Sequence, residues 1–156
     1  MKILVTGVKG QLGFDVVNEL QKRGHTAIGV DIEEMDITNK ESVNTVIHGA
    51  NPDGVIHCAA WTAVDAAEEE ENKEKVMAVN ASGTRYIAEV CKDLAIPMMY
   101  ISTDYIFDGQ GEAPWTPDQQ NYAPLNVYGA SKLAGEQAVK AVSYTHLRAH
   151  ETSQDL

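Results

Sequence analysis

The chain has 156 residues, of which 44% are hydrophobic, and this length and composition suit one globular domain with a sizeable core. Its formal net charge of −11 argues against nucleic acid as a partner, because proteins that bind the phosphate backbone concentrate Lys and Arg. No apolar run is long enough to span a bilayer, no secretory signal opens the chain, and two cysteines are too few for a disulfide framework. We therefore expect a cytoplasmic protein without a membrane partner.

Apolar runs that are typical of buried strands alternate with helical patterns along the chain. The runs expected to form strands are Lys2–Thr6, Thr26–Val30, Gly54–Ala60 and Met98–Ile101. The patterns expected to form helices cover residues 11–23, a capping box at 38–41 with a helix to about 48, residues 72–94, and residues 127–141. Residues 108–124 hold Gly, Pro, Asn and Asp, which predicts a loop. Strands that are apolar throughout predict an α/β fold with a parallel sheet covered on both faces.

The first strand ends in a glycine-rich turn, TGVKGQLG, which opens the first helix. Gly7, Gly10 and Gly13 have the spacing GxxGxxG, and glycine lets a turn take positive φ and lets a pyrophosphate approach the backbone. The start of the helix adds N–H groups and a positive dipole end. The position between a strand and a helix favours a dinucleotide site over an ordinary glycine-rich turn.

Asp31 ends the second strand at the distance expected for an acid that binds the adenosine ribose. A carboxylate there would accept hydrogen bonds from the 2′-OH and repel a 2′-phosphate, which favours NADH. Lys22, Arg23 and Lys40 are the basic residues near it in sequence, so NADPH stays open as the alternative cofactor. A surface turn aspartate without a ligand is the alternative interpretation of Asp31.

Tyr128 and Lys132 stand one helical turn apart, so they share a face of the last helix. A free tyrosine has a pKa of about 10, and a nearby ammonium stabilises its phenolate form. Such a tyrosine can give a proton to a carbonyl oxygen as hydride reaches the carbon. A hydroxyl of Ser102 or Thr103, at the end of the preceding strand, can hydrogen-bond the same oxygen.

The segments TGVKGQLG, VIHCAA, STD and YGASK resemble, in this order, the motifs of the extended short-chain dehydrogenase/reductase family. HCAAWTAVDAAEEE, ISTDYIFDG and PLNVYGASKLAGEQAV are similar to its dTDP-4-dehydrorhamnose reductase branch, and the likeness covers about residues 1–141. It implies a Rossmann-type doubly wound parallel sheet and a nucleotide-sugar substrate. The implied activity of the full-length parent is NADPH- or NADH-dependent reduction of the 4-keto group of dTDP-4-dehydro-L-rhamnose to dTDP-L-rhamnose, a precursor of cell-surface polysaccharide.

The resemblance also implies roles for single residues. Tyr128 is the proton donor, Lys132 orients it and the cofactor ribose, Thr103 stabilises the developing oxyanion, and Thr103 and Asp104 contact the sugar. The residues expected on the cofactor are Gly7, Gly10, Gln11, Leu12, Gly13, Asp31, Asp36, Ile37, Ala60, Trp61, Thr62 and Lys132. Packing at an edge is the alternative role for Trp61. No spacing of His, Cys and carboxylates predicts a metal site.

Two other functions fit parts of the pattern. A regulatory subunit with this fold could bind the cofactor without catalysis, but the intact Tyr128, Lys132 and Thr103 favour an enzyme. A nucleotide-sugar epimerase or dehydratase shares the Tyr–Lys pair, but STDYIFDG and the lack of an acidic pair after the strand-end Thr favour reduction. A homodimer of the full-length parent is an arrangement that the sequence leaves open.

The end of the chain departs from the family, whose members run to nearly twice this length. We expect an incomplete Rossmann domain over residues 1–141, truncated before the last strands and the substrate lobe. VSYTHLRAHET, from Val142, resembles the translation of a common transposon-type sequencing adapter, so we interpret residues 142–156 as a non-native tail. A native reading frame that retains this string would contradict that interpretation.

A sheet without its last strands exposes an edge and an apolar face. We therefore expect the polypeptide as written to be unstable or aggregated and to have little reductase activity. A soluble, active, monomeric product would contradict this expectation.

Overall fold

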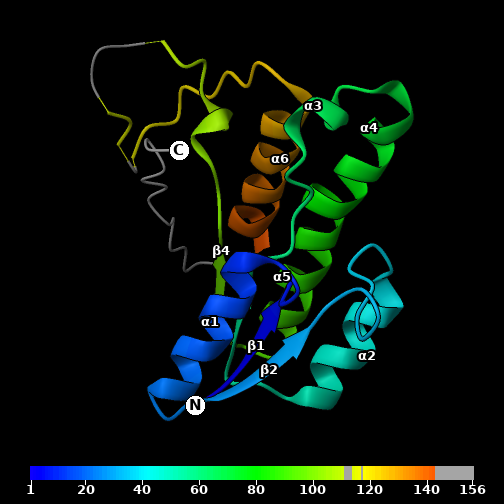
Figure 1. The fold of residues 1–156 in the computed structure, drawn as a ribbon, viewed down its shortest axis with the longest axis vertical. Helices are drawn as coiled ribbons and strands as arrows, with labels where there is room; N and C mark the ends of the chain where they lie inside the picture. The colour runs from blue at the N-terminus through cyan, green and yellow to red at the C-terminus, as the bar shows by residue number, and fades with distance from the viewer. Residues whose placement is uncertain (111–113, 117, 143–156) are drawn as a thin grey trace.

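The computed structural model describes residues 1–110, 114–116 and 118–142, whose strands form one parallel sheet (Figure 1). The strands are β1 (Lys2–Thr6), β2 (Thr26–Val30), β3 (Gly54–His57) and β4 (Met98–Tyr100), in the spatial order β2-β1-β3-β4. The helices are α1 (Gln11–Lys22), α2 (Lys40–Ala50), α3 (Val64–Ala67), α4 (Glu70–Met77), α5 (Thr84–Asp93) and α6 (Val127–Val142). A π-helical segment, η1 (Ala78–Gly83), joins α4 to α5, and a 3₁₀ turn, η2 (Asp104–Ile106), follows β4.

Helices cover both faces of the sheet, which confirms the predicted Rossmann-type α/β fold. Helix α1 packs against β1 and β2, whereas α2, α5 and α6 pack together on the opposite face, as right-handed crossovers require (Figure 1). All strand pairs are parallel, so the carboxyl ends of β1, β2, β3 and β4 meet at one edge of the sheet. The chain order reverses at β1, and ligands of such sheets bind beside that reversal.

The main hydrophobic core lies between the sheet and the face formed by α2, α5 and α6. Leu4, Val55 and Met98 point into it from three strands, and Ile47 and Ile87 come from the covering helices. Along β3 and β4 the alternate residues Ile56 and Met99 are only half-buried on the other face. Among the described residues β4 pairs only with β3, so the sheet has an open edge there. Both features agree with the expected exposure of an edge and an apolar face.

Among the predicted element boundaries that were wrong, two have a clear physical reason. The third strand ends at His57 and not at Ala60, because the backbone N–H groups of Cys58 and Ala59 donate to the Thr6 hydroxyl and leave the ladder. Helix α2 is capped by Asn39 and not by Thr38. The Asn39 side chain accepts from the N–H groups of the first turn, whereas the Thr38 hydroxyl donates to a carboxylate oxygen of Asp36 at 2.7 Å.

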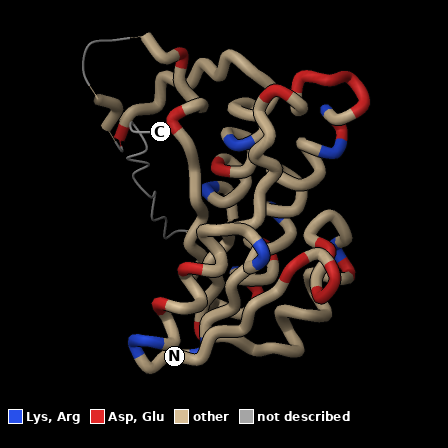
Figure 2. Tube along the Cα trace, in the orientation of Figure 1, with Lys and Arg blue, Asp and Glu red and all other residues tan. Residues whose placement is uncertain are grey.

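The long helix expected over residues 72–94 is interrupted by the π-helical η1 segment. There the Thr84 hydroxyl donates to the Asn80 carbonyl at 2.8 Å. Asn80 itself is buried, and its amide points away from the helix toward neighbouring segments. A π-turn inside a helix is frequent at functional sites, and hydrophobic periodicity does not reveal it. The acidic run at 65–74, drawn red in Figure 2 beside α3 and α4, is mostly exposed, which is typical of a solvated helix face.

Helix α6 lies very close to η1 and β4 because it carries glycine at the contact. A Cβ on Gly135 would lie 2.4 Å from the Asn80 carbonyl oxygen and 2.6 Å from the Tyr100 hydroxyl. A hydrogen bond from that hydroxyl to the Lys132 carbonyl, 3.0 Å long, spans the same contact. The spacing between α6 and the sheet therefore depends on a missing side chain.

We predict that Gly135→Ala in the parent protein lowers the free energy of unfolding by about 1–3 kcal/mol, since the new methyl group overpacks a rigid contact. Gly49→Ala on α2 is the matched control, because nothing lies within 4 Å of the position that its methyl group would take, and alanine favours a helix by up to about 1 kcal/mol. Urea unfolding measures both changes. Equal stabilities for the two variants would contradict the close contact.

Candidate active site

The turn between β1 and α1 forms the floor of a cleft of about 640 Å³ at the carboxyl ends of the strands. Gly7 has φ of +70°, and a Cβ there would come within 2.8 Å of the Ala59 backbone. A Cβ on Gly13 would lie 2.3 Å from the Gly7 carbonyl oxygen, so the helix can start this close to the strand only with glycine. Helix α1 has no side-chain cap and no acidic residue in its first turn. Its first N–H groups and its positive dipole end suit an anion such as a pyrophosphate.

The ends of β1 and β3 are joined by a buried hydrogen-bond network around His57. The Thr6 hydroxyl accepts from the N–H groups of Cys58 and Ala59, so its own proton donates to His57 Nδ1 at 2.7 Å. Since Nδ1 accepts, the single proton of the neutral ring is on Nε2, which donates to the Thr84 hydroxyl at 3.1 Å. Burial, together with the smaller effect of the nearby charge of Lys132, lowers the pKa of His57 to about 3. His57 is therefore a neutral part of the site framework, as a hydrogen-bonded core histidine.

Asp31 lies in the cleft at the end of β2, where its carboxylate is held by the backbone. One oxygen accepts from the Lys9 N–H at 3.0 Å and the other from the Ile32 N–H at 2.9 Å. These bonds link the β2 end to the glycine turn. Lys9 also lines the cleft, and its ammonium forms an ion pair with Glu33. An acid and a base thus stand together at this end of the cleft.

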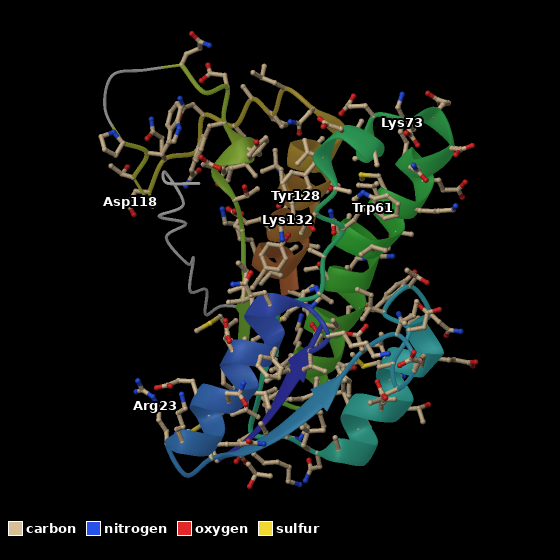
Figure 3. The ribbon with its side chains drawn as sticks, viewed as in Figure 1. Arg23, Trp61, Lys73, Asp118, Tyr128 and Lys132 are labelled. Atoms are coloured by element: carbon tan, nitrogen blue, oxygen red, sulfur yellow. The ribbon has the colours of Figure 1, made fainter. Side chains whose placement is uncertain are left out.

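Tyr128 and Lys132 face the cleft from α6, on the opposite side from the glycine turn (Figure 3). Lys132 is only 5% exposed, and its ammonium donates to the Ile101 carbonyl at 2.5 Å and lies 4.4 Å from the centre of the Tyr100 ring. The Tyr128 ring packs edge-on against Tyr105, with 5.6 Å between ring centres. Burial raises the pKa of Tyr100 well above its ordinary range, so this neighbouring phenol stays protonated. A phenol and a buried ammonium at one wall can serve proton transfer to a carbonyl oxygen.

Asn80 connects the two walls. Its Oδ1 accepts from the Trp61 N–H at 2.8 Å, and its Nδ2 donates to the Trp61 carbonyl and to the Ser131 hydroxyl at 2.9 Å. Ser131 in turn donates to the Tyr128 carbonyl at 2.7 Å. The π-helical segment therefore fixes both the loop after β3 and the first turn of α6.

Most of the residues predicted to bind the cofactor or to act in catalysis line this one cleft. These are Gly7, Gly10, Gln11, Leu12, Gly13, Asp31, Ile37, Ala60, Thr62, Tyr128 and Lys132.

Four predicted residues lie outside the lining. Asp36 accepts from the Thr38 N–H and hydroxyl, and the Trp61 indole N–H donates to the Ala63 carbonyl at 3.0 Å. Thr103 caps η2, where its hydroxyl accepts from the Tyr105 N–H and donates to Asp104, each at 3.3 Å. Ser102, one residue earlier, lines the cleft instead. The roles assigned to these four residues stay predictions.

The basic residues in the cleft differ from those expected. Arg23 pairs with Glu19 at the far end of α1 (Figure 3), and Lys40 pairs with Glu89 across α2 and α5. The base that lines the cleft near Asp31 is Lys9, inside the glycine turn. Its position in the motif TGVKGQLG was the available signal, since a turn that approaches a phosphate brings its own side chains there.

Among the residues that the structure describes, no group of three His, Cys, Asp or Glu side chains is arranged to hold a metal ion. Within the same ranges, no helix has the length and apolar character needed to cross a membrane. Cys58 and Cys91 are unpaired.

Comparison with known proteins gives one family for this arrangement. The family model described as "RmlD substrate binding domain" matches residues 1–149. A dTDP-4-dehydrorhamnose reductase of Streptomyces griseus is 40% identical over 139 residues, which cover 89% of this chain and 45% of that protein. The chain spans about half the length of the curated relatives it matches.

Two solved structures resemble this one closely. A dTDP-4-dehydrorhamnose reductase from Clostridium acetobutylicum has a TM-score of 0.89 and 37% identity, over 95% of this chain and 52% of that one. A dTDP-4-dehydrorhamnose reductase of Bacillus anthracis, solved in complex with NADP, has a TM-score of 0.83 and 36% identity, over 94% of this chain and 51% of that one.

The neutral state of His57 predicts a pH dependence of stability. Its pKa is about 3 in the folded chain against 6.5 for the free group, so between these values the unfolded chain binds the additional proton. The contribution of neutral His57 to the free energy of unfolding is therefore complete above about pH 6.5 and is lost progressively as the pH falls toward 3.

We expect the free energy of unfolding of the parent protein to fall from pH 7 to pH 5, and to fall less steeply in His57→Gln. The difference between the two slopes should reach about 1 kcal/mol per pH unit. Urea unfolding at a series of pH values measures it. Parallel pH profiles for the two proteins would show that His57 is charged, or equally solvated, in both states.

Proposed function

The chain belongs to the family described as RmlD substrate binding domain, and from this membership we propose that it is the cofactor-binding part of a nucleotide-sugar reductase. The proposed reaction of the parent protein is NADPH- or NADH-dependent reduction of the 4-keto group of dTDP-4-dehydro-L-rhamnose, which yields dTDP-L-rhamnose. The observation that carries this proposal is that the glycine turn and the pair Tyr128 and Lys132 line one cleft.

The residues of the cleft fit a nicotinamide dinucleotide. Methyl groups at Gly7 and Gly13 would fill the space between strand and helix, and the uncapped start of α1 presents N–H donors for the pyrophosphate. Asp31 would bind the adenosine ribose, Ile37 would contact the adenine, and Ala60 and Thr62, which line the same cleft, would also contact the cofactor. A bound NADPH or NADH supplies the hydride for the carbonyl carbon.

The chain's own residues would manage the proton and the geometry. The Tyr128 hydroxyl gives its proton to the sugar O4 as the carbon is reduced, and the buried ammonium of Lys132 stabilises the phenolate that remains. The hydrogen bond from Lys132 to the Ile101 carbonyl fixes that ammonium beside the end of β4. Thr103 and Asp104, at the start of η2 just after the end of β4, would contact the sugar.

Both cofactors have a feature in their favour. The carboxylate of Asp31 favours a free 2′-OH and therefore NADH. Lys9 lines the cleft beside Asp31, and its ammonium would offer a partner for the 2′-phosphate of NADPH, in competition with Glu33. The NADP complex of the relative from Bacillus anthracis supports use of NADPH.

Two alternative functions remain distinct from this one. A regulatory subunit would bind the cofactor without turnover, and an epimerase or dehydratase would not consume it. Tyr128 and Lys132 at the wall of the cleft support catalysis over simple binding, and the similar dTDP-4-dehydrorhamnose reductases support reduction.

We also propose that residues 1–141 form an incomplete Rossmann domain, which the half-length coverage of the relatives supports. The proposal of a non-native tail rests on its sequence alone, since residues 143–156 lie outside the described part and the family match runs to residue 149. We further propose that the parent protein is cytoplasmic, which its two unpaired cysteines support. We also propose that the parent protein is a homodimer.

The test is an assay of the purified parent protein with dTDP-4-dehydro-L-rhamnose and either NADH or NADPH. We expect oxidation of at least one cofactor together with formation of dTDP-L-rhamnose. The oxidation is measured by the loss of the absorbance of the reduced nicotinamide. A parent protein that binds a cofactor and turns over neither one would refute the reductase and leave the regulatory subunit.

Tyr128→Phe should lower kcat by roughly 10²–10⁴-fold, because it removes the proton donor. The Kd of NADPH should stay within about threefold, since the dinucleotide is bound mainly by the glycine turn and the start of α1. Tyr86→Phe, which removes a phenol at the α5 surface away from the cleft, should keep full activity. Retention of more than half of kcat in Tyr128→Phe would remove Tyr128 from the mechanism.

A further inference from the structure

Glu136 is a buried carboxylate on α6 that the proposed chemistry does not use. It is only 4% exposed and stands one helical turn beyond Lys132 and two beyond Tyr128, on the same face. Burying a carboxylate is costly unless it is paired and fully hydrogen-bonded. A buried carboxylate on the same face of α6 as Tyr128 and Lys132 therefore points to a function that a hydrophobic side chain could not supply.

The carboxylate of Glu136 accepts hydrogen bonds from two other segments, the end of β4 and the loop at Tyr122, and from Lys140 on its own helix. Its Oε2 accepts from the Ser102 hydroxyl at 2.7 Å, at the end of β4. Its Oε1 accepts from the Lys140 ammonium at 2.7 Å and from the Tyr122 hydroxyl at 3.3 Å, and Lys140 also donates to that hydroxyl at 2.7 Å. Lys140 supplies the compensating charge from the partly exposed side, while the other oxygen, Oε2, accepts from Ser102.

The bond to Ser102 is one of three between α6 and consecutive residues at the end of β4. The Tyr100 hydroxyl donates to the Lys132 carbonyl, the Lys132 ammonium donates to the Ile101 carbonyl, and Ser102 donates to Glu136. The residue after these three is Thr103. A shift of Ser102 would therefore move both the carbonyl that holds Lys132 and the start of η2.

We propose that Glu136 is a positioning residue for the reduction: through Ser102 it holds residues 101–103 and the Lys132 ammonium in register with Tyr128. This inference rests on the proposed function. Because its proton is committed to Glu136, the Ser102 hydroxyl is not a donor to substrate, which leaves the proton transfer to Tyr128. Glu136 itself does not line the cleft.

The test is a double-mutant cycle of Glu136→Gln and Ser102→Ala in the parent protein. We expect each single variant to lower kcat at least about tenfold, since small displacements of reacting groups are that costly, and to leave the KM of the cofactor within about twofold. The double variant should be no slower than the slower single one, because both changes break the same bond. Glu19→Gln, which removes a carboxylate from a surface ion pair on α1, is the matched control and should match the parent.

Hydrogen–deuterium exchange of the segment 98–106 gives a second readout that needs no turnover. Exchange should be faster in Glu136→Gln and in Ser102→Ala than in the parent protein and in Glu19→Gln. Losses of kcat that multiply in the double variant, unchanged kcat in a folded Glu136→Gln, or unchanged exchange in either single variant would each overturn the inference. A parent protein without turnover would instead refute the proposed function, and the exchange data would still decide whether Glu136 holds the end of β4.

Discussion

The contact between α6 and the end of β4 is the constraint on which the site depends. Gly135 lets the helix approach within reach of Tyr100 and Asn80, and hydrogen bonds from or to Tyr100, Lys132 and Ser102 then fix its height along the strand. Because Tyr128 and Lys132 are carried by this helix, their place in the cleft follows from that fit. A residue with a side chain at position 135 would push the helix, and the Tyr–Lys pair with it, away from the sheet.

A second set of buried hydrogen bonds connects the ends of β1 and β3, on the other side of the cleft, to α6. Thr6, His57 and Thr84 connect the ends of β1 and β3 to the helix behind them, and Asn80 continues the connection to Ser131 on α6. No buried side-chain polar atom is without a hydrogen-bond partner among the described residues. Fully satisfied networks of this kind hold a unique arrangement, whereas partly satisfied ones are costly. The glycine turn and α6 are thus parts of one rigid frame, although they are far apart in sequence.

The sequence predicted the parts of this frame that depend on local pattern. Apolar runs indicated the four strands, the glycine spacing indicated the turn that lines the cleft, and the i, i+4 spacing put Tyr128 and Lys132 on one face. What depends on tertiary contacts was missed. The π-helical turn at Asn80, the cap at Asn39 in place of Thr38, and the shorter third strand all follow from hydrogen bonds to groups that are remote or ambiguous in sequence. Lys9 was missed because the bases expected near Asp31 were sought outside the glycine turn, and no local pattern marks Glu136 as a buried carboxylate.

The central claim is that this cleft brings a dinucleotide and a keto sugar together for direct reduction at C4. The most direct measurement uses the parent protein with dTDP-4-dehydro-L-rhamnose and NADPH or NADH deuterated at both C4 positions, followed by NMR of the sugar product. Direct reduction predicts one deuterium at C4 of the product for each cofactor oxidised. Cofactor oxidation without deuterium at the sugar C4, or conversion of the sugar without cofactor oxidation, would contradict it.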